Sequence, residues 1–225
     1  MLPKGSWPNV FQEAAKAMEE YLFSRNVLPP NSEFHALYLH ALNQYYSNRE
    51  STHAESGTLY LLTTLLAKTA IKKVAPEIVE GALDAFYSVT RENWQVDPHS
   101  LTTLHALHEQ GFQVGMVSNA ANEKDVLTLL DNFQLTDSLE FVITSFGCGY
   151  RKPHPAIFTK VSEYWNIPLN QVIMVGDRTD TDILGARSIG MRTAWLNRYK
   201  QRNKTPGAIP DLEIRSLPEL ISCLN

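Results

Sequence analysis

Cysteine is scarce in this sequence, and its two cysteines, Cys148 and Cys223, stand far apart. They match no metal-binding or redox spacing, so we expect a protein of a reducing compartment, the cytoplasm, without a disulfide framework. The sequence also lacks an apolar run long enough to span a bilayer and the basic-then-apolar start of a signal peptide. We therefore expect no membrane partner.

A strong net charge is absent as well. The formal net charge of -4 and the isoelectric point of about 6.0 give no general attraction to nucleic acid. The one short basic stretch, near Arg198, is too small for a nucleic-acid surface, so we expect no nucleic-acid partner. With 44% hydrophobic residues in 225, the chain can bury a substantial core, and we expect small-molecule chemistry.

The first part of the chain is patterned as helices. Apolar residues recur at helical spacing in four segments, Val10–Tyr21, Phe34–Tyr45, Leu61–Leu66 and Pro76–Phe86. Pro76 suits the first turn of the last helix. No strand is expected before about Trp94.

After Asp97-Pro98 the pattern changes to an alternation of helices and strands. A helix ending near Gly111 precedes expected strands at Phe112–Val117, Phe141–Ile143, Val172–Val175 and Thr193–Leu196, with helices between them and a last helix at Leu217–Leu224. Strands separated by helices of this length form a parallel sheet with right-handed crossovers. The predicted fold class is therefore α/β, with a doubly wound parallel sheet.

Polar residues follow these strands at the edge where an open parallel sheet binds ligands. Ser118 and Asn119 follow the first strand, where a hydroxyl, an amide and exposed backbone N–H groups suit an anion. Capping of the next helix explains both residues equally well. Lys152, in the constrained run Lys-Pro-x-Pro, is suited to neutralise a phosphate oxygen, although an isolated lysine is more commonly a solvated charge.

Three carboxylates crowd the loop that follows a third strand. Gly176 permits a tight turn, and Asp177, Asp180 and Asp182 come directly after it. Helix capping explains one of these acids but not all three, and neighbouring carboxylates repel unless a cation or hydrogen-bond donors compensate them. Oxygen ligands without a nearby histidine or cysteine favour Mg²⁺ held together with a substrate phosphate.

In this order, Ser118, Lys152 in Arg-Lys-Pro-His-Pro, and Gly176-Asp177 followed by Asp182 resemble motifs two to four of the haloacid dehalogenase-like superfamily, phosphatase type. The resemblance implies that Ser118 and Lys152 are catalytic and hold the transferring phosphoryl group, with Asn119 also binding substrate. It implies that Asp177 ligates Mg²⁺ directly and that Asp182 supports it or acts through water. It also implies a helical cap at residues 13–95 and an α/β core at 96–225.

The family's first motif, a strand ending in Asp-x-Asp-x-Thr that carries the nucleophile, has no counterpart here, because no aspartate occurs before Asp84. Residues 1–12 resemble the linker that follows this motif, so Met1 is interpreted as an internal methionine of a longer frame. That strand is central in the family's sheet. Without it, we expect its neighbours to lose hydrogen-bond partners.

The resemblance predicts a Mg²⁺-dependent phosphomonoesterase that in its complete form acts on a small phosphorylated metabolite through an aspartyl-phosphate. We expect a monomer or a homodimer. The main alternative is a non-catalytic binding or regulatory relative that has lost the nucleophile. A haloacid dehalogenase needs no Mg²⁺, and the retained Asp177 and Asp182 argue against it.

Overall fold

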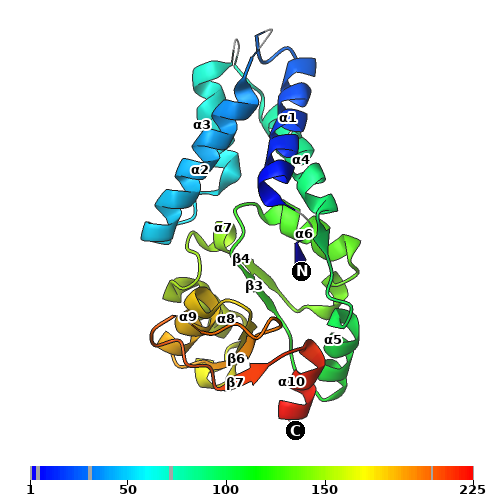
Figure 1. The fold of residues 1–225 in the computed structure, drawn as a ribbon, viewed down its shortest axis with the longest axis vertical. Coiled ribbons are helices and arrows are strands. Elements are labelled where there is room, and N and C mark those ends of the chain that lie inside the picture. The colour runs from blue at the N-terminus through cyan, green and yellow to red at the C-terminus, as the bar shows by residue number, and fades with distance from the viewer. Residues whose placement is uncertain (1, 4–5, 30–31, 71–72, 204, 225) are drawn as a thin grey trace. The chain divides into compact units, whose positions relative to one another are not determined.

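The computed structural model describes residues 2–3, 6–29, 32–70, 73–203 and 205–224. The chain divides into two compact units, which are drawn together in Figure 1. The helical unit comprises Met1–Thr52, Ser56–Asp97 and Ala121–Leu129, and the core unit comprises His53–Glu55, Pro98–Ala120 and Leu130–Asn225. Within the described ranges, no helix has both the length and the apolar character to cross a membrane.

The helical unit contains the expected helices α1 (Trp7–Ser24), α2 (Phe34–Thr52), α3 (Gly57–Thr69) and α4 (Pro76–Glu92). Pro76 lies in the first turn of α4 after an extended Ala75, as the sequence predicts. Figure 1 shows α1 beside α4, and these two helices pack against each other. Fully buried side chains such as Met18, Tyr38 and Phe86 fill the interior.

A short antiparallel pair, β1 (Leu2–Pro3) with β2 (Trp94–Gln95), also belongs to the helical unit. The expectation of no strand before Trp94 was therefore wrong, because a strand of two residues is too short to show a period. Of the linker expected at residues 1–12, residues 1, 4 and 5 lie outside the described ranges. Residues 2–3 form β1, and α1 begins at Trp7.

The core unit alternates strands and helices, and the α/β fold class is confirmed. The elements after β2 are α5 (Ser100–Glu109), β3 (Met116–Ser118), α6 (Glu123–Asn132, shared with the helical unit), η1 (Thr136–Ser138), β4 (Val142–Thr144), α7 (Ser145–Cys148), α8 (Pro155–Trp165), η2 (Leu169–Gln171), β5 (Ile173–Gly176), η3 (Thr179–Ile183), α9 (Leu184–Ser188), β6 (Arg192–Leu196), β7 (Leu212–Ile214) and α10 (Leu217–Leu224). The short elements α7 and β7 escaped prediction. The strand expected at Phe112–Val117 is only β3, and the helix expected between the strands Val172–Val175 and Thr193–Leu196 starts as the π-helical turn η3.

The strands of the core unit form two parallel sheets, β3-β4 and β5-β6-β7. Their registers bring Ser118 opposite Thr144 and Gly176 opposite Trp195. β3 and β5 are not hydrogen-bonded to each other, which agrees with the expectation that strands of this sheet lose partners without the strand of the first motif. Apolar packing connects them, because Val117 of β3 and Met174 of β5 pack against the same buried cluster.

Leu62 and Leu59 of α3 give a matched test of packing in the helical unit. Leu62 is fully buried, whereas Leu59 is 38% exposed. We expect Leu62→Ala to lower the free energy of unfolding by about 2–5 kcal/mol, because it leaves a cavity. Leu59→Ala should cost less than about 1 kcal/mol. Urea denaturation of both variants measures the difference, and equal losses would contradict the packing described here.

Arg91 links α4 to the start of α6 within the helical unit. Its guanidinium donates to Asp84 at 2.9 Å and to Asp125 at 3.1 Å. Burial raises the pKa of Asp125 to about 6, although the ion pair with Arg91 opposes this shift. The folded state therefore binds a proton at Asp125 more tightly than the unfolded chain does.

This raised pKa makes stability depend on pH in a defined direction. Between about pH 4 and about pH 6 the folded state holds more protons at Asp125 than the unfolded state does, so the Asp125 contribution falls as pH rises. Asp125→Asn should remove this part of the pH dependence. Asp84→Asn, which alters the half-exposed partner of Arg91, should retain it. Unfolding free energies measured by urea denaturation across this range test the sign, and an unchanged slope in Asp125→Asn would contradict it.

Candidate functional site

Lys152 is the centre of the polar network at the ends of the core strands. Its side chain is only 9% exposed, its Nζ donates to the carbonyl oxygen of Val117 at 2.8 Å, and it forms an ion pair with Asp182 Oδ1 at 2.8 Å. A buried ammonium group requires such partners, because an unpaired charge in the interior is costly. Lys152 therefore joins β3, through Val117, to the loop that follows β5.

Asp182 is held from two sides. Oδ1 faces Lys152, and Oδ2 accepts a hydrogen bond from the Arg178 backbone N–H at 3.1 Å. A Cβ atom at Gly176 would collide with this carboxylate, so the absence of a side chain at the end of β5 permits its approach. The π-helical turn Thr179–Ile183, a geometry often found at functional sites, carries Asp182 into this position.

Asn119 holds the backbone of Lys152. Its Oδ1 accepts from the Lys152 backbone N–H at 2.7 Å, and its Nδ2 donates to the Lys152 carbonyl oxygen at 3.0 Å. The alternative that Asn119 caps the next helix is wrong, because Asn122 Oδ1 accepts from the backbone N–H of Asp125 in the first turn of α6. This pair of hydrogen bonds ties the loop after β3 to the loop that contains Lys152.

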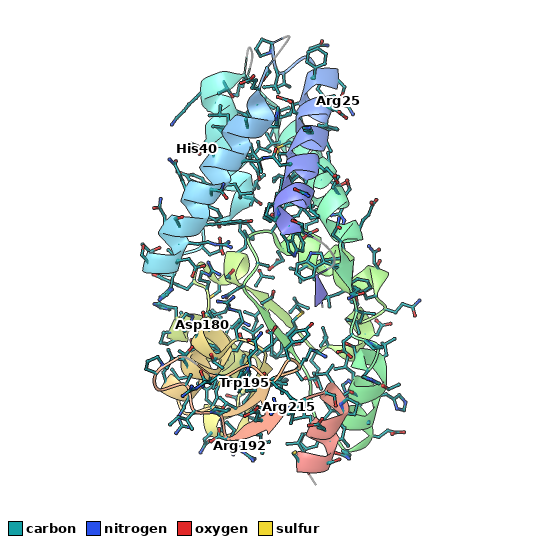
Figure 2. The ribbon with its side chains drawn as sticks, viewed as in Figure 1. Arg25, His40, Asp180, Arg192, Trp195 and Arg215 are labelled. Carbon is teal, nitrogen blue, oxygen red and sulfur yellow. The ribbon has the colours of Figure 1, made fainter. Side chains whose placement is uncertain are left out.

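Ser118 lies at the end of β3, and Asp177 comes directly after β5. Their side chains make fewer contacts than those of Lys152, Asp182 and Asn119. Ser118 is half-buried at the end of β3, and its hydroxyl makes no hydrogen bond within the described residues. Asp177 is exposed, and its carbonyl oxygen accepts from the indole N–H of the buried Trp195 at 3.1 Å. Trp195 on β6, which is labelled in Figure 2, thus fixes the peptide that presents the Asp177 carboxylate.

The acidic side chains of this network determine whether it can hold Mg²⁺. Among the described residues no group of three or more acidic, histidine or cysteine side chains gathers at one point. Mg²⁺ is commonly held by one or two carboxylates together with substrate phosphate and water. Asp177 fits this pattern as a direct ligand, whereas Asp182 Oδ1 is already ion-paired with Lys152 and Oδ2 accepts a hydrogen bond from Arg178.

Two residues beside this network are missing from the sequence prediction. Ser145, at the start of α7, and Glu55, between α2 and α3, are both buried and hydrogen-bonded to each other at 3.0 Å. Glu55 follows a helix, not a strand, so the expectation that binding residues come directly after strands does not include it. No sequence signal marks it.

Comparison with known proteins identifies the family. The family model described as haloacid dehalogenase-like hydrolase matches residues 33–196, so the chain belongs to this family. The chain is 30% identical over 152 residues to a glyceraldehyde 3-phosphate phosphatase from Pyrococcus furiosus, covering 67% of this chain and 63% of the relative. It is 37% identical over 130 residues to haloacid dehalogenase-like hydrolase domain-containing protein 3 from Danio rerio, covering 57% of this chain and 52% of the relative. The chain thus spans about half to three-fifths of these relatives' length.

Solved structures support the same fold. A HAD phosphatase from Thermococcus onnurineus matches with a TM-score of 0.64 at 24% identity, covering 94% of this chain and 88% of that one. A 2-haloacid dehalogenase from Pseudomonas syringae matches with a TM-score of 0.69 at 21% identity, covering 99% and 95%. At these identities the likeness concerns the fold alone. It does not separate a phosphatase from a dehalogenase.

The buried Lys152–Asp182 pair and the exposed Arg178–Asp180 pair allow a matched comparison. Asp182→Asn removes the charge that compensates a buried ammonium, so we expect a loss of about 3–5 kcal/mol in the free energy of unfolding. Asp180→Asn breaks a pair whose side chains are 63% and 48% exposed, and should cost at most about 1 kcal/mol. Chemical denaturation of both variants provides the test. A loss in Asp182→Asn no larger than in Asp180→Asn would show that the buried pair is not a structural requirement.

Proposed function

We propose that this chain supplies the phosphate- and metal-binding residues of a Mg²⁺-dependent phosphomonoesterase that acts on a small phosphorylated metabolite. The observation that carries the proposal is the network around Lys152, which brings a buried cation, a hydroxyl and an exposed carboxylate to the ends of β3 and β5. This position is where open α/β sheets bind ligands. The named activities of several relatives, glyceraldehyde 3-phosphate phosphatase and ribulose-1,5-bisphosphate 5-phosphatase, agree with such a substrate class.

Lys152 is the proposed anchor of the transferring phosphoryl group. An ammonium group has three N–H donors; one donates to the Val117 carbonyl, and the group is also ion-paired with Asp182. A further donor is suited to a phosphoryl oxygen, where the positive charge stabilises the negative charge of the transition state. Since burial and Asp182 fix the ammonium before substrate binds, little reorganisation is needed during the reaction.

Ser118 and Asn119 complete the proposed phosphate site. The Ser118 hydroxyl is suited to donate to a second phosphoryl oxygen. Asn119 Nδ2 has a second amide hydrogen besides the one that it donates to Lys152, so it can contact substrate while Asn119 positions the Lys152 backbone. In this proposal Asn119 serves substrate binding mainly by holding the two loops at a fixed separation.

The proposed metal ligand is Asp177. Asp182 supports the site indirectly, through its ion pair with Lys152. A bound Mg²⁺ would neutralise charge on the phosphoryl oxygens. Asp177 presents its carboxylate from a peptide that Trp195 fixes, while Asp182 holds Lys152 and contributes through water at most. The nucleophilic aspartate of the family's first motif is not provided by any of these residues.

The helical unit is proposed as the cap that closes over substrate and sets substrate choice, in keeping with the expectation for residues 13–95. Residues 96–225 are proposed as the catalytic core. We further propose a cytoplasmic protein, monomeric or homodimeric, that has a small phosphorylated substrate and no nucleic-acid partner. Size-exclusion chromatography with light scattering decides the oligomeric state.

Release of inorganic phosphate from a panel of sugar phosphates, with Mg²⁺ and with a chelator, tests the proposed function. In the complete form that carries the aspartate of the first motif, we expect Mg²⁺-dependent turnover that Asp177→Asn lowers about 100-fold or more, because a metal ligand is lost. Asp180→Asn is the control and should retain activity, since Asp180 pairs with Arg178 on the surface.

The other outcomes of this assay separate the alternatives. Phosphate binding without turnover by the complete form favours a non-catalytic relative. Halide release from a 2-haloacid that persists in the chelator favours a dehalogenase. Either result contradicts the proposed phosphomonoesterase.

A further inference from the structure

A segment between two helices of the helical unit belongs to the core unit. His53–Glu55 connects α2 to α3, yet it groups with the core residues. Ala54 forms an antiparallel bridge with Tyr150. The Glu55 backbone N–H donates to the carbonyl of Gly149 at 2.9 Å, and the Arg151 backbone N–H donates to the carbonyl of His53 at 2.9 Å. We call His53–Glu55 the strap.

The backbone turns sharply where the strap begins. His53 has φ of 55°, in the left-handed region that non-glycine residues seldom occupy. Gly57, at the start of α3, has φ of 80°. The conformation of His53 carries a cost, which the hydrogen bonds of the strap to residues 149–151 offset.

Glu55 is the buried side chain of the strap. It is 6% exposed, and its Oε2 accepts a hydrogen bond from the hydroxyl of Ser145 at 3.0 Å. Ser145 is itself fully buried, and its Oγ also lies 3.0 Å from the carbonyl oxygen of Ala120. The backbone N–H of Phe146 donates to the same Ala120 carbonyl at 3.1 Å. A carboxylate is buried in this way only where donors compensate its lost hydration.

The strap is therefore linked to both loops that carry the proposed phosphate-binding residues, directly to one and through Ser145 to the other. Ala120 comes directly after Ser118 and Asn119, and Arg151 comes directly before Lys152. The Asn119 side chain bonds to the Lys152 backbone through both of its polar atoms, so the two loops are already joined. Glu55, acting through Ser145, holds the Ser118–Ala120 loop. The backbone of the strap holds the Arg151–Lys152 loop through its hydrogen bonds to residues 149–151.

We propose that Glu55 is a positioning residue for the phosphate site: it sets the separation of the Ser118–Ala120 loop and the Arg151–Lys152 loop. This inference rests on the proposed function, in which Ser118 and Lys152 bind the same phosphoryl group. The acceptor oxygen of Glu55 is the feature that matters, because it fixes Ser145 against Ala120. Through this residue, a segment that belongs to the helical part of the sequence controls the geometry of anion binding in the core unit.

The test compares Glu55→Ala, Glu55→Gln and Ser145→Ala, with Glu20→Ala on the exposed side of α1 as the control. Inorganic phosphate is the binding probe, titrated in the presence of Mg²⁺. Glu55→Ala and Ser145→Ala should weaken phosphate binding about tenfold or more, because a buried polar group loses its partner. Glu55→Gln keeps an acceptor for Ser145 and should remain within about fivefold of the unaltered chain. Glu20→Ala should leave binding unchanged.

A merely structural role would not produce this order. If Glu55→Gln loses as much affinity as Glu55→Ala, or if Ser145→Ala binds phosphate normally, the positioning role is overturned. Ser145→Ala keeps the test informative if Glu55→Ala does not fold.

Amide hydrogen exchange separates a failure of this inference from a failure of the proposed function. If the unaltered chain binds no phosphate, the proposed function fails. Faster exchange at the Phe146 and Arg151 backbone N–H groups in Glu55→Ala, with near-normal exchange in Glu55→Gln, would still support the bracing of the two loops. Unchanged exchange at both positions in Glu55→Ala would overturn it.

Discussion

One ammonium group joins the two halves of the core unit. Lys152 Nζ binds the Val117 carbonyl on β3 and the Asp182 carboxylate after β5, although these strands belong to separate sheets. Such a contact is stable only in a position where the charge is compensated and the ammonium is held by more than one acceptor. The positions of Asn119, Gly176 and the π-helical turn follow from it, since each brings a partner of Lys152 into range. The interaction that compensates the buried charge of Lys152 also holds its ammonium group in place for the proposed anion site.

The sequence predicts most of the fold because its periodic segments are long enough to carry a signal. The four early helices and α10 were predicted from the spacing of residues such as Leu62 and Leu220. The elements that escaped are short: β1 has two residues, β7 has three, and α7 has four. The lack of pairing between β3 and β5 could be expected only from the absent first-motif strand, because pairing between strands is not encoded by periodicity within a strand.

The candidate site was predicted in its residue types but not in its contacts. Ser118, Lys152 and Asp177 follow strands, so their position at one sheet edge could be inferred. That Lys152 and Asp182 bind each other is a matter of side-chain direction at the ends of separate elements, and no sequence spacing fixes it. Glu55 could not be found at all, because its partners Ser145 and Ala120 are far from it in the chain and become neighbours only after folding.

The boundary between the two units does not follow the order of the sequence. Ala121–Leu129, which comes directly after the Ser118–Ala120 loop, belongs to the helical unit, where Thr58 donates to the Ala121 carbonyl and Arg91 pairs with Asp125. Conversely, His53–Glu55 lies in the sequence between two helices of the helical unit but belongs to the core unit. A chimera that transplants the helical unit from one relative to another as a single continuous segment would therefore separate both sets of partners. The transferable module consists of residues 1–52, 56–97 and 121–129 taken together, with the strap left in its original core.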